Sequence, residues 1–387
     1  MKTARLLFAG YAPVHFVCFR PVYERLRDVQ GLEVWFSGGQ VVDEREDGTK
    51  VYDTAALYDP LEVPRDRVLT LEEMRTRPFD LVFCAHTSGF FPIRRCPRVQ
   101  IFHGVSFRNM AIREKQDQYD YFFVAGPYMR RGFRKRGVLL AGDPRALEIG
   151  FPKLDRLVDG SLDRETILRG LNLKGDRPVL LYAPTGAKGN SLETMGEEVI
   201  RRIKTADHWD LLVKPHDHPK NRIDWFARLR KLEGAHVKLI RDFDVVPYLY
   251  AADLLVTDAS SVASEYSLLD RPIVFLDVPK VLATARRKGS LVDLHTYGRR
   301  TGVTVRKAAE VTGVIRWFLG HPGYRGSVRR AMSKDLFYAP GTATDRAVDW
   351  ILQRLARRRA HRKTVRDQVC GSDVQRRSRH SRTRRGL

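Results

Sequence analysis

The sequence predicts an α/β fold made of two doubly wound domains that face each other across a cleft. Its length of 387 residues suits about two domains of roughly 150 residues each. Hydrophobic residues make up 43% of the chain, which is enough for two sizeable cores. Short apolar runs alternate with amphipathic segments along most of the chain, and this is the pattern of parallel strands joined by helices.

The first half of the chain contains six apolar runs with the length and composition of buried strands. Polar or amphipathic segments separate them, which is typical of a parallel sheet covered on both faces. The predicted strands are Arg5–Ala9, Leu32–Phe36, Asp80–Ala85, Arg98–Phe102, Tyr121–Ala125 and Leu147–Gly150. The predicted helices are Val17–Arg27, Thr70–Arg77 and Pro127–Arg136. In the second of these helices, Thr70 and Glu73 stand at the spacing of a capping box.

A polar segment rich in turn residues, Leu171–Pro178, predicts the linker between the domains. After it the alternation of strands and helices restarts. The predicted strands are Pro178–Ala183, Asp210–Lys214, His236–Arg241, Leu254–Thr257 and Pro272–Leu276. The predicted helices are Ser191–Lys204, Ile223–Glu233, Val246–Ala252, Val262–Leu269, Lys307–Phe318 and Thr344–Arg357. We therefore expect an N-terminal domain over residues 1–170, a second domain over 171–345, and a closing helix with a tail over 346–387.

The charge of the chain is strongly positive and unevenly placed. Lys and Arg number 69 against 46 Asp and Glu, a net charge of +23. Residues 354–387 hold twelve arginines and one lysine against two aspartates, and large apolar residues are nearly absent beyond residue 366. This composition predicts a disordered basic tail. Such a tail suits an anionic lipid surface, a nucleic acid or an anionic polymer, and the remaining alternative is a solvated segment without a partner.

Cysteine usage and apolar run length limit the class of protein. The four cysteines form no C-x-x-C pair and no spacing typical of zinc, so we expect reduced thiols in a cytoplasmic protein and no metal site. The N-terminal apolar run ends at Ala9, so it reads as a first strand rather than a secretory leader. No run approaches the roughly 18 apolar residues that a membrane-spanning helix needs.

Residues that follow the predicted strands are the candidate site residues, because ligands of open α/β sheets bind beyond the carboxyl ends of the strands. His103 and Gly104 follow one strand. An imidazole suits a general base, and a glycine permits close approach of a ligand to the backbone. The alternative is a histidine that only caps the strand end. Thr185 and Gly186 follow another strand, with an ordinary turn as the alternative.

The segment that follows Asp210–Lys214 is cationic and carries two prolines. Lys214 ends the predicted strand, and His216 and His218 come directly after it. Lysine and histidine together suit the binding of phosphate oxygens. A metal pair is less favoured, because no acidic or cysteine partner stands at ligand spacing, and solvated loop histidines are the remaining alternative.

The segment Asp258–Ser261 runs from an apolar strand into a helix. The free amides and the positive dipole end of a helix N-terminus attract a diphosphate, and Ser260 and Ser261 add hydroxyl donors. Glu265 lies about one turn further on, where a carboxylate can accept hydrogen bonds from a ribose. The alternative is that one serine simply caps the helix. The chain lacks the glycine-rich motifs of ordinary dinucleotide and P-loop sites.

Taken together and in this order, these motifs resemble the CDP-glycerol glycerophosphotransferase family, the teichoic-acid polymerases and primases of bacterial cell-wall synthesis. Two further stretches, Tyr119–Phe122 and Gly150–Asp155, resemble the intervening segments of that family. The resemblance spans residues 99–348. The motifs that carry it are His103-Gly104, Tyr182-Ala-Pro-Thr185, Lys214-Pro-His216, and Thr257-Asp-Ala-Ser-Ser261 with Leu269-Asp-Arg-Pro272.

The resemblance implies a GT-B fold with an acceptor-binding N-terminal domain and a nucleotide-binding C-terminal domain. It implies transfer of glycerol phosphate from CDP-glycerol to a hydroxyl group, with release of CMP and without a metal or cofactor. His103 is then the base, and Lys214 and His216 bind the phosphate under attack. The remaining assignments are Ser260, Ser261 and Thr185 for the donor phosphates, Glu265 for the ribose, and Gly104, Asp258 and Arg271 as supporting residues.

The chain departs from the family pattern at several of these positions. Gly186 and Ala259 replace aromatic residues, Glu265 replaces a frequent aspartate, and either His216 or His218 fits the basic motif. These departures leave the donor open among CDP-glycerol, CDP-ribitol and a nucleotide sugar. The alternative function is a GT-B glycosyltransferase or nucleotide-sugar 2-epimerase that uses a UDP-sugar. Only the net charge favours a nucleic-acid-binding protein.

The family resemblance and the basic tail also predict the partners. They are a CDP-alcohol donor and a lipid-linked or polymer acceptor with a free hydroxyl, and no specific nucleic acid. The basic tail predicts attraction to an anionic membrane surface. We therefore expect a cytoplasmic protein or one held peripherally at the inner face of the plasma membrane.

Overall fold

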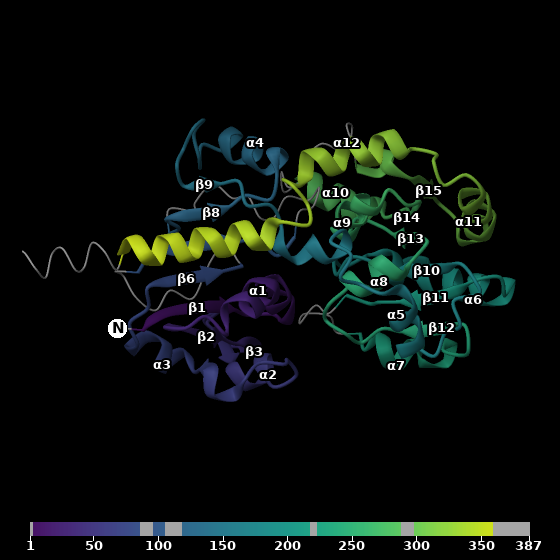
Figure 1. The fold of residues 1–387 in the computed structure, drawn as a ribbon. Helices are drawn as coiled ribbons and strands as arrows, with labels where there is room; N and C mark the ends of the chain where they lie inside the picture. Colours follow the sequence, from purple (N-terminus) through teal and green to yellow (C-terminus); the bar gives the residue numbers. More distant parts are fainter. Residues whose placement is uncertain (1–2, 86–95, 105–117, 217–222, 288–297, 359–387) are drawn as a thin grey trace, which may run out of the picture.

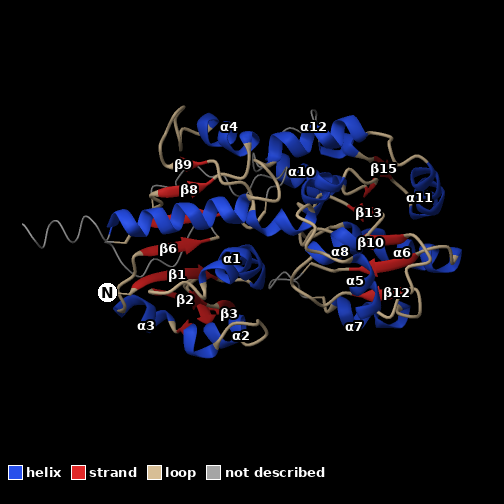
Figure 2. Cartoon of the chain, viewed as in Figure 1, coloured by secondary structure: helices blue, strands red, loops and turns tan. Residues whose placement is uncertain are grey.

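The computed structural model describes residues 3–85, 96–104, 118–216, 223–287 and 298–358. Within this part of the chain, the first domain is built on a parallel sheet of seven strands in the order β5-β2-β1-β6-β7-β8-β9 (Figures 1 and 2). The strands are β1 (Ala4–Gly10), β2 (Leu32–Gly38), β5 (Val68–Leu69), β6 (Leu81–Cys84), β7 (Arg98–Ile101), β8 (Tyr121–Phe123) and β9 (Ala146–Leu147). The helices are α1 (Pro13–Leu26), α2 (Thr54–Tyr58), α3 (Leu71–Thr76) and α4 (Pro127–Lys135).

The second domain is built on a parallel sheet of six described strands in the order β12-β11-β10-β13-β14-β15. The strands are β10 (Val179–Tyr182), β11 (Asp210–Val213), β12 (Val237–Leu239), β13 (Leu254–Thr257), β14 (Ile273–Leu276) and β15 (Val303–Val305). Its first four helices are α5 (Arg164–Gly170), α6 (Glu197–Ala206), α7 (Trp225–Leu229) and α8 (Val246–Ala251). The later helices are α9 (Val262–Tyr266), α10 (Pro279–Arg287), α11 (Val311–Gly320) and α12 (Gly326–Leu336).

The chain crosses back to the first domain after α12. A closing helix over residues 343–358 lies across that domain in Figure 1. Its apolar residues Ala347, Ile351 and Leu355 belong to the same buried cluster as Phe8 and Phe36 of the first sheet. The two domains are therefore joined twice, once before β10 and once through this helix.

The first joint is the 3₁₀ segment Pro152–Leu157, here called the junction segment. It packs against both α1 and α8, which belong to different domains. The carboxylate of Asp155 accepts hydrogen bonds from three backbone amides at the start of the closing helix, at 2.6 to 3.1 Å; the donors are Gly341, Ala343 and Thr344. The junction segment thus contacts both halves of the molecule and its last helix.

The predicted fold class is confirmed, and each predicted strand has a counterpart, although β9 (Ala146–Leu147) shares only Leu147 with the predicted strand Leu147–Gly150. The capping box at Thr70 and Glu73 is present. Helix α1 begins at Pro13, four residues before the predicted start, because proline is well suited to the first helical position. The hairpin of β3 (Gln40–Glu44) and β4 (Lys50–Asp53) was not predicted. Neither were β5, β15, α2, α5, α10 and α12.

The predicted domain boundaries stay predictions, although α5 packs on α8 of the second domain. The predicted basic tail lies outside the described residues beyond position 358. Among the described helices, none has the length and apolar character that crossing a membrane would require.

Candidate active site

The carboxyl edges of the two sheets meet at the predicted motifs. Gly104 follows β7 of the first domain, and Ser261 follows β13 of the second. A Cβ atom placed on Gly104 would lie 3.4 Å from Oγ of Ser261 and 3.6 Å from its Cβ. The His103-Gly104 turn and the Ser260-Ser261 turn therefore approach within van der Waals contact, and one small ligand can touch both.

The imidazole of His103 is fixed in one tautomer by the backbone. Its Nδ1 atom lies 2.7 Å from the carbonyl oxygen of Ala85. A carbonyl only accepts hydrogen bonds, so Nδ1 carries the hydrogen and Nε2 is the basic nitrogen of the neutral ring. Burial lowers the pKa of His103 and outweighs the hydrogen bond to Ala85, which raises it. A neutral imidazole with a basic Nε2 is the form that a general base requires.

A second imidazole, that of His15, packs against His103 and was missed by the sequence analysis. The ring centroids lie 5.1 Å apart, and His15 is only 1% exposed. Its Nδ1 accepts a hydrogen bond from the backbone amide of Tyr11 at 3.2 Å. His15 stands in the first turn of α1, directly beyond β1, so the rule that selected His103 also applies to it.

Asp258 ties the loop after β10 to the turn after β13. Its Oδ1 accepts from the amide of Thr185 at 2.8 Å, and its Oδ2 accepts from the amide and the hydroxyl of Ser191 at 2.9 Å each. All three residues are buried. The carboxylate of Asp258 therefore shapes the loop that begins at Thr185. Its predicted role in supporting the site stays a prediction.

Lys214 and His216 follow β11 at the same edge of the second sheet. Lys214 is buried, whereas His216 is exposed. A Cβ atom placed on Gly186 would lie 2.8 Å from Nδ1 of His216, so the glycine leaves room for this ring. A side chain at position 186 would therefore displace the ring of His216 from this position. His218 lies outside the described residues, and the choice between the two histidines stays a prediction.

The serine turn leads into α9. The hydroxyl of Ser261 makes no capping hydrogen bond to the helix, which argues against the simple N-cap alternative for this residue. Ser260 is buried beside it. The assignment of both serines to the donor phosphates stays a prediction.

Glu265 is bound by a lysine of the junction segment. The ammonium group of Lys153 lies 3.0 Å from Oε1 and 2.9 Å from Oε2 of Glu265, and the two side chains are 4% and 1% exposed. Contact of Glu265 with a ribose stays a prediction that requires this ion pair to open. The sequence analysis missed the pairing, although Lys153 lies in the Gly150–Asp155 stretch that matched the family.

Arg271, predicted as a supporting residue, donates hydrogen bonds to the backbone. Its Nη1 donates to the carbonyl oxygens of Tyr250 and Ala252 at 2.6 and 2.7 Å, at the end of α8. The neighbouring Asp270 adopts a left-handed backbone conformation with φ of 49°, which aspartate tolerates better than most residues. Both residues therefore shape the connection from α9 to β14.

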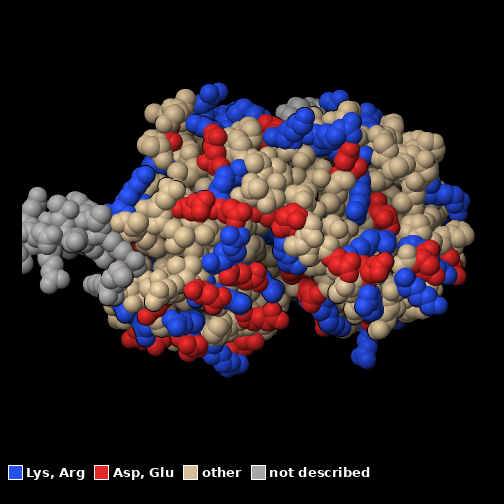
Figure 3. All heavy atoms as spheres, in the orientation of Figure 1, with Lys and Arg blue, Asp and Glu red and all other residues tan. Residues whose placement is uncertain are grey.

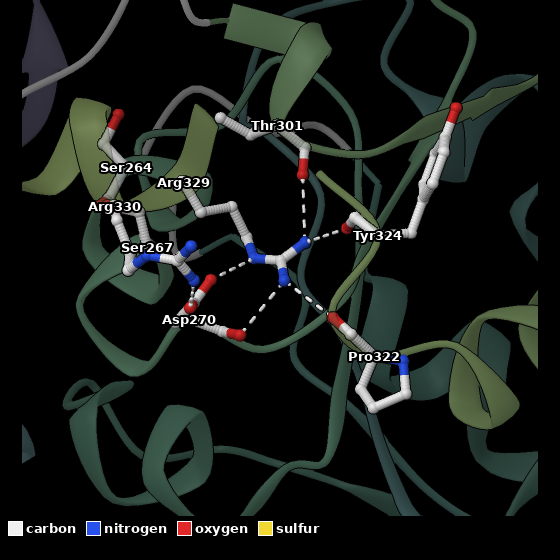
Figure 4. Close-up of polar contacts among 8 residues, drawn as sticks. All are labelled: Ser264, Ser267, Asp270, Thr301, Pro322, Tyr324, Arg329 and Arg330. Atoms are coloured by element: carbon white, nitrogen blue, oxygen red, sulfur yellow. Dashed lines mark hydrogen bonds and ion pairs between the residues drawn. The ribbon is translucent and has the colours of Figure 1, made fainter. Parts of the chain in front are cut away.

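Asp270 also anchors α12 through a buried arginine (Figure 4). Arg329 is 0% exposed and donates through Nε to Oδ1 of Asp270 at 2.9 Å. Its other nitrogens donate to backbone carbonyls, which belong to Asp270, Thr301, Pro322 and Tyr324. Among the residues that the structure describes, no group of three or more histidine, cysteine or acidic side chains is placed to hold a metal ion.

Comparison with known proteins agrees with these motifs. The sequence model of the family described as CDP-Glycerol:Poly(glycerophosphate) glycerophosphotransferase matches residues 93–353. The chain is 31% identical over 179 residues to the teichoic acid glycerol-phosphate primase of Bacillus subtilis (strain 168), an alignment that covers 45% of this chain and 43% of that protein. It is 30% identical over 168 residues to the teichoic acid poly(glycerol phosphate) polymerase of Staphylococcus epidermidis, covering 41% of this chain and 22% of the polymerase. The chain thus spans less than half the length of these relatives.

Solved structures show the same fold. The wall teichoic acid polymerase TagF superposes with a TM-score of 0.63 at 16% identity, covering 92% of this chain and 90% of the polymerase. The UDP-GlcNAc 2-epimerase of Neisseria meningitidis gives a TM-score of 0.55 at 12% identity, covering 90% and 100%. These likenesses establish the two-domain GT-B arrangement, and the family match extends over more than half of the sequence. The chain therefore belongs to the CDP-glycerol:poly(glycerophosphate) glycerophosphotransferase family.

Proposed function

We propose that this protein transfers glycerol phosphate from CDP-glycerol to a hydroxyl group of a cell-wall or surface-polymer acceptor and releases CMP. One observation carries the proposal beyond family membership. Gly104, the residue directly after His103, approaches Ser261, so the His103-Gly104 turn of the first domain lies against the serine turn of the second. A general base and a phosphate-binding turn on opposite domains are what a two-substrate phosphoryl transfer requires.

The proposed reaction assigns one task to each group. Nε2 of His103 accepts the proton of the acceptor hydroxyl as its oxygen attacks the phosphorus atom that bears glycerol. The bond between that phosphorus and the bridging oxygen breaks, and the bridging oxygen leaves with CMP. Lys214 and His216 stabilise the negative charge of the transferred group, while Ser260 and Ser261 hold the diphosphate with Thr185. Such positioning and charge stabilisation supply most of the catalysis in phosphoryl transfer.

The test is product release by the purified protein. Incubated with CDP-glycerol and a lipid-linked glycerol phosphate acceptor, it is expected to release CMP and lengthen the acceptor by one glycerol phosphate. His103→Asn is expected to slow both by about 100-fold or more. CDP-ribitol and UDP-GlcNAc in parallel reactions identify the donor. Release of UDP, or interconversion of a UDP-sugar without an acceptor, would replace this proposal with the glycosyltransferase or 2-epimerase alternative.

We also propose that the acceptor is met at an anionic membrane surface. Basic side chains gather over α4 and α12 in Figure 3, and these two helices are in contact through the ion pair of Arg131 with Asp335. Each basic residue near an anionic surface contributes roughly 1 kcal/mol of attraction. Removal of residues 359–387 is expected to weaken flotation of the protein with phosphatidylglycerol vesicles. Unchanged flotation would exclude the tail as the attracting segment.

A further inference from the structure

The junction segment makes a separate charged contact with each part of the molecule around the site. Lys153 pairs with Glu265 of α9 at 2.9 Å, and Arg156 pairs with Asp244, just before α8, also at 2.9 Å. Asp155 binds the amides at the start of the closing helix. The segment therefore contacts α9, which follows the serine turn, and also the closing helix, which packs on the first domain.

The contact between Lys153 and Glu265 is the most buried of these ion pairs. Burial opposes the charge on Lys153, but the nearby Glu265 carboxylate outweighs it and holds the pKa of Lys153 above its ordinary value. Removal of one member of such a pair leaves the other charge buried without compensation, whereas replacement of both by apolar side chains is often tolerated. A pair of this kind adds little net stability, so its presence here points to a role in geometry.

We propose that Lys153 and Glu265 are positioning residues whose buried ion pair fixes the Ser260-Ser261 turn against the domain that carries His103. Glu265 lies one turn into the helix that the serine turn opens, so any displacement of Glu265 moves the turn. Lys153 lies on a segment packed against α1, the helix that carries His15. His15 in turn packs against His103.

The charges of the pair also reach His103. Among the described residues, the ring of His15 and the carbonyl of Ala85 contact its imidazole, and the charges of Lys153 and Glu265 act on its pKa from further away. Lys153 lowers the pKa of His103 and Glu265 raises it, so the two contributions oppose each other. Loss of the Lys153 charge is therefore expected to raise this pKa, loss of the Glu265 charge to lower it, and loss of both to change it little.

The experiment measures the pKa of His103 by NMR of histidine ring protons, with its signal assigned by its absence in His103→Gln. Lys153→Met is expected to raise that pKa, Glu265→Gln to lower it, and the double variant to return it close to the wild-type value. Shifts in the same direction, or none, would overturn the proposal. Arg25→Met is the matched control, because Arg25 and Asp345 form an exposed ion pair between α1 and the closing helix.

The second measurement is of kcat and KM in the same variants, and it rests on the proposed function. The double variant is expected to lose on the order of 100-fold in kcat, because a small misplacement of reacting groups has an effect of that size. Its KM for CDP-glycerol is expected to rise as well, because the displaced serine turn is the one proposed to hold the diphosphate. Lys153→Arg keeps the positive charge, and we expect it to retain more of the wild-type kcat than Lys153→Met. A raised KM with unchanged kcat in Glu265→Gln would instead assign the carboxylate to donor binding. If the wild-type protein releases no CMP, the proposed function fails, while the NMR shifts still decide the role of the pair.

Should Lys153→Met fail to fold, the double variant keeps the inference testable, since it leaves no buried charge unpaired. Its thermal midpoint is expected to lie closer to the wild-type value than that of Lys153→Met. A double variant with wild-type kcat and wild-type structure around Ser260 would show that the ion pair does not position the turn.

Discussion

The chemistry of the site depends on which nitrogen of His103 carries a proton. The carbonyl of Ala85 takes the Nδ1 hydrogen, and burial disfavours the protonated ring. Both effects prepare Nε2 to accept a proton from an attacking hydroxyl. The position of one backbone carbonyl at the end of β6 thus determines the chemistry of a side chain that follows β7.

A pH profile tests this state of His103. Because burial lowers the pKa of His103 below its ordinary value of 6.5, the neutral base form predominates at neutral pH. We expect kcat/KM to rise with pH along a single acid limb whose midpoint lies below 6.5, and then to level off. His103→Asn is expected to lower kcat by about 100-fold or more. A wild-type limb that persists in this variant would assign the titrating group to another residue.

Sequence reasoning found His103 because it follows a recognisable buried strand. It did not single out His15, which lies between the predicted strand Arg5–Ala9 and the predicted helix start at Val17; because the helix begins at Pro13, His15 stands in its first turn. It missed the partner of Glu265 because Lys153 lies 112 residues away along the chain. No local pattern reports a contact of that sequence separation.

At the scale of elements, Asp258 holds two loops in the shape that a phosphate site needs. Asp258→Ala would leave the buried amides of Thr185 and Ser191 without their acceptor, at a cost of about 1–3 kcal/mol for each unsatisfied group. We expect a lower thermal midpoint and weaker CMP binding, measured by calorimetry. Ser260→Ala is the control, because we expect it to weaken CMP binding without lowering the midpoint. Unchanged stability in Asp258→Ala would show that the loops do not depend on the carboxylate.

The anchor of α12 is a second case in which one side chain places an element. The guanidinium of Arg329 fills a buried site with donors in several directions, toward Asp270 and toward backbone carbonyls. A lysine carries one donor group and cannot reach these acceptors together. We therefore expect Arg329→Lys to lower the thermal midpoint by several degrees, whereas Arg330→Lys, at an exposed position, has little effect. Equal midpoints for the two variants would contradict the anchoring role.

The same helix shows why part of the fold could not be predicted. Strands such as β10 and β13 are buried along their whole length, so apolar runs reveal them. Helix α12 buries Arg329 together with Met332 and Leu336, and an arginine in the buried face breaks the apolar pattern. The β3–β4 hairpin is mostly exposed and has no apolar face to recognise. Its signal was Asp47-Gly48, with Gly48 at φ of 80°, which is typical of a hairpin turn.

At the scale of the whole molecule, the site exists only where the two domains meet. The sequence predicted which residues follow each strand, but not that Gly104 and Ser261 would come into contact. The junction segment and the closing helix, which contact each other, are the two connections between the domains that bear this contact. Their interactions join residues far apart in the chain, and periodicity gives no information about them.

The closing helix offers the most direct test of this arrangement. Ile351 is 0% exposed in the core of the first domain, whereas its neighbour Leu352 is 36% exposed on the same helix. Full burial of a large apolar side chain contributes roughly 1.5–3 kcal/mol, and a buried aspartate without a partner adds a further cost. We expect Ile351→Asp to lower the thermal midpoint and to reduce kcat, because a detached helix no longer holds the first domain against the serine turn. Leu352→Asp is expected to leave both unchanged. If Ile351→Asp loses stability but keeps its full kcat, the closing helix stabilises the first domain without aligning the two halves of the site.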